Sequence, residues 1–517
     1  MKHRLNTDRK CRAKNAKSAK AFIPLLPAHD MFRKSVSKSV FHPCFIRGKK
    51  KMTTRQTLDL LRAYESRNVL FTEPDGSWPI VWERAQGVHV WDAEGKKYLD
   101  LTAAFGVAAA GHANPRVVKA GQKQMAKLLH AMGDVHPHAL KAQLARELSK
   151  ITFERWAGRA KFQIPNSEFQ AGKVIFSNSG FEAVETALKT AMLATGRRGV
   201  IAFEGAYHGL GYGALNATHR EHFRGPFRSQ LREFGHFVPF PFSSCGSRRE
   251  EAHSKNRKSE IGSRKFSEPP HVGCYEVEKH IRQIFRREKI GAILVEPIQA
   301  RGGINIPPPE FLPLLRKLCD EHGALLILDE IYTGFGRTGK WFACEHSGVV
   351  PDLVCLGKAL TGGFPLSACI GRADLMDAAW PVSQGEAIHT STFLGHPVGC
   401  AMALAQIAEI RRLKLCERSD RLGKFLLDQL QFEIPNSQFQ TSARGIGLMV
   451  GLEVRRADGS PATDESLRAI KTMLQRGFIL LPEGEHGNVI SFTPPLTITE
   501  EQLATTVGML KDVLNHG

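Results

Sequence analysis

This 517-residue sequence lacks long apolar runs and paired cysteines, and each absence excludes a class of protein. No run of about 18 uninterrupted apolar residues occurs, so a membrane-spanning helix is not expected. The ten cysteines are scattered, with no Cys-x-x-Cys pair and no secretory apolar segment, so neither a disulfide framework nor a structural zinc site is expected. A composition of 42% hydrophobic and 24% charged residues is typical of globular proteins, and the thiol pattern predicts a cytoplasmic one.

Acidic residues are scarce at the start of the chain. Fifteen Lys and Arg residues lie within Met1–Lys51 and only Asp8 and Asp30 oppose them, so this tenth of the chain carries +13 of the net charge of +20. Three explanations stay open: an extension that is absent from the working protein, an organelle transit peptide, or an arm that binds polyanions. The first is favoured, because Met52 follows a run of three lysines and is itself followed by an ordinary helix start.

Short apolar runs alternate with helical stretches in the rest of the chain. A hairpin is predicted over residues 88–101, and a helix from Pro115 to about His130. Continuous apolar runs follow at residues 173–177, 199–203, 291–296 and 324–329. Such runs between helices indicate a mostly parallel sheet with helices on both faces. Ligands of these sheets collect at the carboxyl ends of the strands, where Glu296 and Asp329 fall.

The segment at residues 176–185 offers a site for a phosphate. Ser179 and Glu182 form an S-x-x-E capping box, which predicts that a helix begins directly after a strand. The free N–H groups of such a helix start can bind a phosphate. Taken alone, the segment is more simply explained as an ordinary capped helix.

Three further residues suggest chemistry. Lys358 is flanked by small residues directly after an apolar run, an environment that lowers the pKa of an amine and prepares it to react with a carbonyl. Asp329 ends a strand 29 residues earlier and can pair with a cationic ring nitrogen, bind a metal or cap a helix. Tyr207 lies in a glycine-framed turn that suits stacking on a flat ring. Alone, Lys358 fits a buried structural lysine and Tyr207 a core aromatic.

Together the four features match one molecule. Pyridoxal 5'-phosphate (PLP) requires a phosphate site, a lysine for its aldehyde, an acid for its pyridine nitrogen and an aromatic ring that stacks on it. With this combination the sequence resembles the class-III (subgroup II) PLP-dependent aminotransferases, which have fold type I. The resemblance extends from about residue 70 to the C-terminus and includes Gly-His-Ala-Asn-Pro at residues 111–115 and Thr-Pro-Pro-Leu-Thr at residues 493–497.

The resemblance implies an α/β fold with a large domain, built on a mostly parallel sheet, and a smaller α+β domain built from the two chain ends. We therefore expect the basic extension at residues 1–51 to precede an N-terminal segment, at 52–105, that joins the small domain. The large PLP-binding domain is expected at 106–396 and the C-terminal small domain at 397–517. Residues 243–270 lack an apolar period and are expected to form a surface insertion.

The resemblance also implies roles for single residues. Lys358 corresponds to the Schiff-base lysine that shuttles a proton, and Asp329 to the acid that keeps the pyridine nitrogen protonated. Further cofactor contacts are implied for the phosphate-site residues Ser179, Gly180 and Phe181, for Tyr207, His208 and Ile331 around the ring, for Glu296, and for Thr392. The last of these reaches the phosphate across a subunit interface in the family, which implies a homodimer with shared sites. No metal is implied.

The substrate-binding positions depart from the family pattern. Members similar to the ornithine and 4-aminobutyrate enzymes have Arg where this sequence has Leu210, and Glu where it has Arg301. A second family Arg aligns with Ser491, and a frequent Gln with Tyr332, which is a further candidate for substrate binding. Our hypothesis is that Arg301 binds the substrate carboxylate in place of the usual pair. The alternative is that it points to solvent or pairs with a neighbouring acid.

These observations imply an aminotransferase that moves an amino group from an amino acid or ω-amine donor to a 2-oxo acid by a ping-pong mechanism. Two alternatives stay open. One is another reaction of the same cofactor, such as that of an aminomutase, racemase or lyase. The other is a polyanion-binding protein that acts through its basic N-terminal arm, which the location of the charge disfavours. The substituted positions also argue against a typical acetylornithine or 4-aminobutyrate enzyme.

Overall fold

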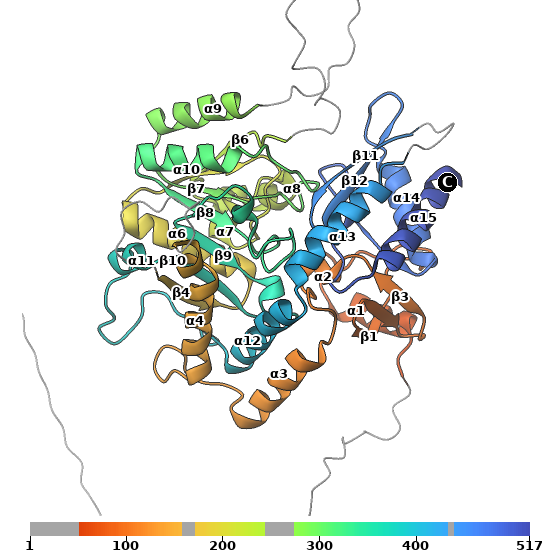
Figure 1. The fold of residues 1–517 in the computed structure, drawn as a ribbon, viewed down its shortest axis with the longest axis horizontal. Coiled ribbons are helices and arrows are strands. Elements are labelled where there is room, and N and C mark those ends of the chain that lie inside the picture. The colour runs from red at the N-terminus through yellow and green to blue at the C-terminus, as the bar shows by residue number, and fades with distance from the viewer. Residues whose placement is uncertain (1–50, 158–170, 243–272, 433–438, 517) are drawn as a thin grey trace, which may run out of the picture. The chain divides into compact units, whose positions relative to one another are not determined.

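The computed structural model describes residues 51–157, 171–242, 273–432 and 439–516, and the chain divides into two compact units, Met1–Lys51 and Met52–Gly517. The predicted insertion at residues 243–270 and the basic extension up to residue 50 lie outside the described residues. The second unit contains the elements shown in Figure 1.

A seven-stranded sheet lies at the centre of the second unit, with strand order β4-β10-β9-β8-β7-β5-β6. All neighbouring strands are parallel except those beside β10, which runs antiparallel to both β4 and β9. The predicted, mostly parallel sheet is therefore confirmed. Its strands are β4 (Gly172–Ser177), β5 (Gly199–Phe203), β6 (Gly235–Val238), β7 (Ile290–Val295), β8 (Leu325–Asp329), β9 (Leu353–Leu356) and β10 (Ser367–Arg372).

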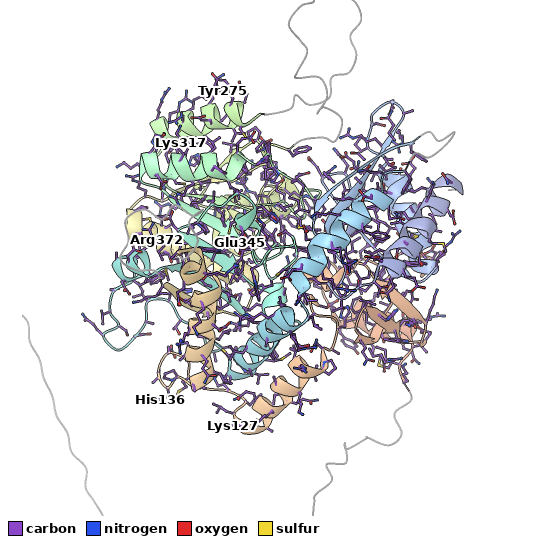
Figure 2. The ribbon with its side chains drawn as sticks, in the orientation of Figure 1. Lys127, His136, Tyr275, Lys317, Glu345 and Arg372 are labelled. Carbon is purple, nitrogen blue, oxygen red and sulfur yellow. The ribbon has the colours of Figure 1, made fainter. Side chains whose placement is uncertain are left out.

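Helices cover both faces of this sheet. Leu294 of β7 and Ile327 of β8 belong to the same core cluster as the apolar side of α6 (Gly180–Thr195). Their neighbours along the strands point to the other face and pack with α10 (Phe311–His322). Burial on both faces explains why these strands are continuous apolar runs. The solvent-facing side of the helices carries exposed side chains such as Tyr275 of α9 (Cys274–Arg287) and Lys317 of α10 (Figure 2).

Two four-stranded sheets join distant parts of the sequence. The first has the order β1-β2-β3-β13 and contains the predicted hairpin, which is confirmed; β13 from the C-terminal part runs parallel to β3. The second has the order β11-β12-β15-β14. The strands are β1 (Trp82–Gln86), β2 (His89–Asp92), β3 (Lys97–Asp100), β11 (Phe439–Ile446), β12 (Met449–Arg456), β13 (Phe478–Ile479), β14 (Leu481–Glu483) and β15 (Val489–Phe492).

The predicted helix after Pro115 is present but shorter than expected. It begins where the Asn114 side chain accepts the N–H groups of Arg116 and Val117, with Pro115 in its first turn. It ends at Lys127 rather than near His130, because the following residue is already extended. This helix is α3 (Pro115–Lys127). The remaining α-helices are α1 (Thr54–Tyr64), α2 (Ala103–Gly106), α4 (Ala139–Ile151), α5 (Phe153–Ala157), α7 (Tyr212–Leu215), α8 (Glu221–Arg224), α11 (Ala373–Ala379), α12 (Pro397–Arg412), α13 (Leu415–Gln429), α14 (Thr463–Gln475) and α15 (Glu500–His516). In the part of the chain that the structure describes, no helix is long and apolar enough to cross a membrane.

Two helical glycines give a matched test of this packing. A Cβ on Gly423 of α13 would lie 2.1 Å from the carbonyl oxygen of Gly447, whereas one on Gly508 of α15 would meet nothing within 4 Å. We expect Gly423→Ala to lower the free energy of unfolding by about 1–3 kcal/mol through overpacking. Gly508→Ala should raise it by roughly 0.5–1 kcal/mol, because alanine favours the helix. Urea unfolding measures both, and equal effects of the two variants would contradict the packing described.

Candidate active site

Three neighbouring strands bring charged groups to one edge of the central sheet. Glu296 directly follows β7, Asp329 ends β8, and Lys358 lies two residues beyond β9. Glu296 and Asp329 are 6% and 5% exposed. The carboxyl ends of these parallel strands meet at the same edge, as the sequence predicted.

Asp329 is held by two hydrogen bonds. One carboxylate oxygen lies 2.8 Å from Nδ1 of His208, and the other accepts the N–H of Ile331 at 3.1 Å. Since an ionised carboxylate only accepts, we assign the proton of this contact to Nδ1. The other ring nitrogen, Nε2 of His208, is buried and has no hydrogen-bond partner among the described residues. The pair is therefore buried with one ring nitrogen still available to a ligand.

Glu296 fixes the turn that carries Tyr207. Its carboxylate accepts the N–H of Tyr207 at 3.0 Å and that of Ala300 at 3.1 Å. Burial raises the pKa of Glu296, and the nearby His208 opposes that shift. Glu296 thereby links the Tyr207 turn to the loop after β7.

The Lys358 side chain is half-buried, in a pocket beside the Tyr332 ring. Its Nζ is 4.0 Å from the centre of the Tyr332 ring, a cation–π distance. Burial lowers the pKa of Lys358 to about 8, although Asp329, Glu296 and a further acid favour its charged form. Its backbone has a φ of +44°, in the left-handed region, which is uncommon for a residue with a side chain. The amine is thus closer to its neutral, nucleophilic form than an ordinary lysine.

The start of α6 lies beside this pocket. A Cβ on Gly180 would lie 3.0 Å from Cδ1 of Ile331, and one on Gly357 would lie 3.3 Å from its Cγ2, so the Ile331 side chain contacts both glycines. The predicted capping box of Ser179 is present, which confirms that a helix begins here after a strand. The N–H groups of Gly180 and Phe181 have no acceptor among the described residues. They are the free donors to which the sequence pattern assigns a phosphate.

Tyr332 connects the pocket to both ends of the second unit. Its hydroxyl lies 3.0 Å from Oγ1 of Thr493, and burial raises the pKa of Tyr332 to about 12. A Cβ on Gly106 would lie 2.8 Å from the Tyr332 ring, so the ring packs directly on that backbone. The ring therefore forms one wall of the Lys358 pocket.

Arg301 pairs with an acid that sequence reasoning missed. Nε of Arg301 lies 3.6 Å from a carboxylate oxygen of Glu483, and the two side chains are 35% and 4% exposed. The Arg301 guanidinium is 5.7 Å from the centre of the Tyr207 ring. Burial raises the pKa of Glu483 to about 7, while Arg301, Arg220 and Lys358 lower it. A signal for Glu483 was present, since it closes an apolar run just as Glu296 and Asp329 do.

Three other positions were singled out by the sequence. Thr392 is exposed, in the segment before α12. Leu210, where the family has Arg, is also exposed. The hydroxyl of Ser491 donates to the carbonyl of Leu481 within the β14–β15 pair, so it is used by the strand pairing.

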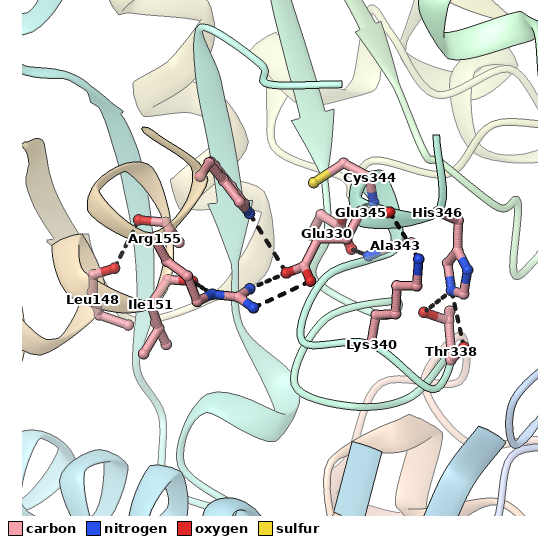
Figure 3. A network of polar contacts seen from close by, with 12 residues as sticks. Leu148, Ile151, Arg155, Glu330, Thr338, Lys340, Ala343, Cys344, Glu345 and His346 are labelled. Atoms are coloured by element: carbon pink, nitrogen blue, oxygen red, sulfur yellow. Dashed lines mark hydrogen bonds and ion pairs between the residues drawn. The ribbon is translucent and has the colours of Figure 1, made fainter. Parts of the chain in front are cut away.

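A buried polar network holds the chain that follows Asp329 (Figure 3). The Glu330 carboxylate accepts the N–H groups of Ala343 at 2.9 Å and Cys344 at 2.8 Å, and burial raises its pKa to about 7. Glu345 forms an ion pair with Arg155 of α5. Sequence reasoning did not identify this network, whose residues are up to 190 positions apart. This network fixes the loop that begins after Asp329, the last residue of β8.

Comparison with known proteins agrees with this geometry. The family description Aminotransferase class-III matches residues 71–514. The chain is 34% identical over 440 residues to the 5-aminovalerate aminotransferase of Pseudomonas aeruginosa, covering 85% of this chain and 94% of that protein. It is 36% identical over 448 residues to the putrescine aminotransferase of Pectobacterium atrosepticum, covering 85% and 83%.

A solved structure gives the same result. The amine transaminase of an uncultivated Pseudomonas species, in its PLP-bound form, superposes with a TM-score of 0.73 at 27% identity, covering 87% of this chain and 98% of that one. Family match, relatives and fold agree over most of the chain. The chain therefore belongs to the class-III aminotransferase family, and it is a PLP-dependent enzyme that transfers amino groups.

Proposed function

We propose that Lys358 is the lysine that bonds to the aldehyde of PLP and that Asp329 pairs with its pyridine nitrogen. The observation that carries this proposal is the meeting of a desolvated amine and a buried carboxylate at the ends of two adjacent parallel strands. Free N–H groups at the start of α6 support binding of the phosphate at Ser179, Gly180 and Phe181. The residues present fit the cofactor.

Bound PLP supplies an aldehyde and a ring that accepts electrons from the reacting carbon. Lys358 would take the proton from the carbon that bears the donor's amino group and pass it to the aldehyde carbon of the cofactor, and would carry it back when the acceptor reacts. Asp329, held by His208 and by the N–H of Ile331, would pair with the pyridine nitrogen and favour its protonated form. Ile331 would contact one face of the ring and Tyr207 the other. Glu296 positions Tyr207 through its backbone N–H.

Lys358→Ala removes the reacting amine, so this variant should lack the visible absorption band of the PLP-bound wild type, whereas Lys123→Ala on the exposed side of α3 should keep it.

Because the pKa of Lys358 is lowered to about 8, the neutral amine predominates above that pH. The rate at which cofactor-free protein regains the band should therefore rise from about pH 6 and level off above about pH 8. A band in Lys358→Ala, or a rate that still climbs above about pH 10, would exclude Lys358.

We also propose that the working enzyme is a homodimer in which Thr392 of one subunit reaches the phosphate site of the other. Support comes from the exposure of Thr392 and from exposed apolar residues that a second subunit would cover. They include Phe181 at the phosphate site and Phe393 beside Thr392, together with Met125, Leu128, Leu129, Met132, Val135 and Ile388.

Thr392→Ala should weaken PLP binding by roughly tenfold through loss of one phosphate contact, without dissociating the dimer. Thr505→Ala, an exposed threonine on α15, is the matched control and should change neither property. Sedimentation velocity reports the assembly, and titration with PLP reports the affinity. A monomer that binds PLP as tightly as its relatives do would contradict the shared site.

The proposed reaction takes an amino acid or ω-amine donor and a 2-oxo acid acceptor by a ping-pong mechanism, in the cytoplasm. The relatives named for 5-aminovalerate and putrescine support an ω-amine donor.

Arg301 anchors the substrate carboxylate, supported by its place near Tyr207 and by the absence of Arg at positions 210 and 491. Tyr332 lines the same pocket beside Lys358. The seven described cysteines are all free thiols, which suits a reducing compartment.

Arg301→Gln should raise the KM for a 2-oxo acid by roughly 10- to 100-fold, because a charge-assisted hydrogen bond is lost. Arg286→Ala, an exposed arginine on α9, should leave KM unchanged. Steady-state kinetics with pyruvate and 2-oxoglutarate measure both variants. An unchanged KM for donor and acceptor in Arg301→Gln would remove the anchor.

A further inference from the structure

We propose that Glu483 determines the charge of the accepted substrate: beside Arg301 it admits a single carboxylate and disfavours dicarboxylic 2-oxo acids. This inference rests on the proposed function, because Arg301 is taken as the carboxylate anchor. It assigns a specificity role to a residue that no part of the reaction itself requires.

Glu483 is a buried acid with an incomplete set of partners. It ends β14, its side chain is 4% exposed, and no described residue donates a hydrogen bond to its carboxylate. Its contact with Arg301, at 3.6 Å from Nε, is longer than a hydrogen bond. Nε of Arg301 is itself buried without an acceptor among the residues described. Two opposite charges thus lie next to each other, each with bonding capacity left for a ligand.

Arg220 holds the main chain of Arg301 next to that of Gly484, the residue after Glu483. Its guanidinium donates to the carbonyl of Arg301 at 3.1 Å and to that of Gly484. The N–H of Gly484 also donates to the carbonyl of Arg301, at 3.2 Å. One nitrogen of Arg220 is therefore committed to the backbone, and it ties the two strands of main chain that carry Arg301 and Glu483 to each other. Arg220 acts here as a positioning residue.

The charges around Arg301 favour one carboxylate over two. A dicarboxylate needs two cationic partners, but the family Arg positions are Leu210, which is uncharged, and Ser491, whose hydroxyl serves the strand pair. A carboxylate bound by Arg301 brings the second carboxylate of the same molecule near the Glu483 carboxylate, while Arg220, the other guanidinium near Glu483, already donates to two backbone carbonyls. Two like charges a few ångströms apart in a poorly solvated pocket repel strongly. A monocarboxylic 2-oxo acid avoids this repulsion.

The ionisation of Glu483 sets the conditions of the test. Burial raises the pKa of Glu483 to about 7, Arg301, Arg220 and Lys358 lower it, and Glu296 raises it. At pH 8.5 the carboxylate is mostly ionised, so the repulsion is present.

The test measures binding of two unreactive probes, propionate and glutarate, to the PLP-loaded protein at pH 8.5 by calorimetry. The wild type should bind propionate at least about tenfold more tightly than glutarate, and Glu483→Gln should bring this ratio close to one. Glu483→Asp, which keeps the charge, should preserve a preference. Glu485→Gln removes the same charge from an exposed residue two positions away and should leave the ratio unchanged.

Two results would overturn the proposal: a wild type that binds glutarate as tightly as propionate, or a Glu483→Gln ratio equal to that of the wild type. The wild-type ratio decides even where Glu483→Gln does not fold. The outcome is separable from the proposed function, which the visible PLP band and amino transfer test independently. A protein that passes those tests but binds both probes equally overturns the role of Glu483 alone.

Discussion

Burial of opposite charges at the carboxyl ends of β7, β8 and β9 is the constraint on which the active site depends. Moving a charge out of water is costly unless a partner stabilises it. Asp329 meets this requirement through His208 and a backbone N–H, and Glu296 through two backbone N–H groups. Lys358 has no such hydrogen-bonded anion among the described residues, and burial lowers its pKa to about 8. The same burial that a sheet core provides for stability thus prepares the amine for its reaction.

The surrounding structure holds these groups in place through contacts between distant segments. Tyr332, beside Lys358, contacts Gly106 from the N-terminal part and Thr493 from the C-terminal part. Glu330, the residue after Asp329, fixes the loop beyond the strand through two backbone N–H groups. Such contacts limit motion of the pocket walls, and precise placement of reacting groups is a large part of catalysis.

Much of this arrangement could be predicted from the sequence, because its signals are local. The apolar runs predicted β4, β5, β7 and β8, the capping box predicted the start of α6, and the acids closing two of the runs lie at one edge of the sheet. Glu483 carried a similar signal, but its β14 belongs to a different sheet, so strand ends alone did not bring it to Lys358. The Arg155–Glu345 pair joins residues far apart in the chain and leaves no local pattern. Helix α3 ended early, since the chain beyond Lys127 turns extended without a glycine or proline to mark it.

The central claim is that Lys358 is the residue that bonds to PLP. Borohydride reduction of the PLP-loaded protein, followed by proteolysis and mass spectrometry of the peptides, tests it most directly, because reduction converts the link into a stable secondary amine. The account predicts one modified lysine, Lys358, with a single cofactor per subunit. A cofactor attached to any other lysine, or no modified peptide from a fully loaded protein, would contradict it.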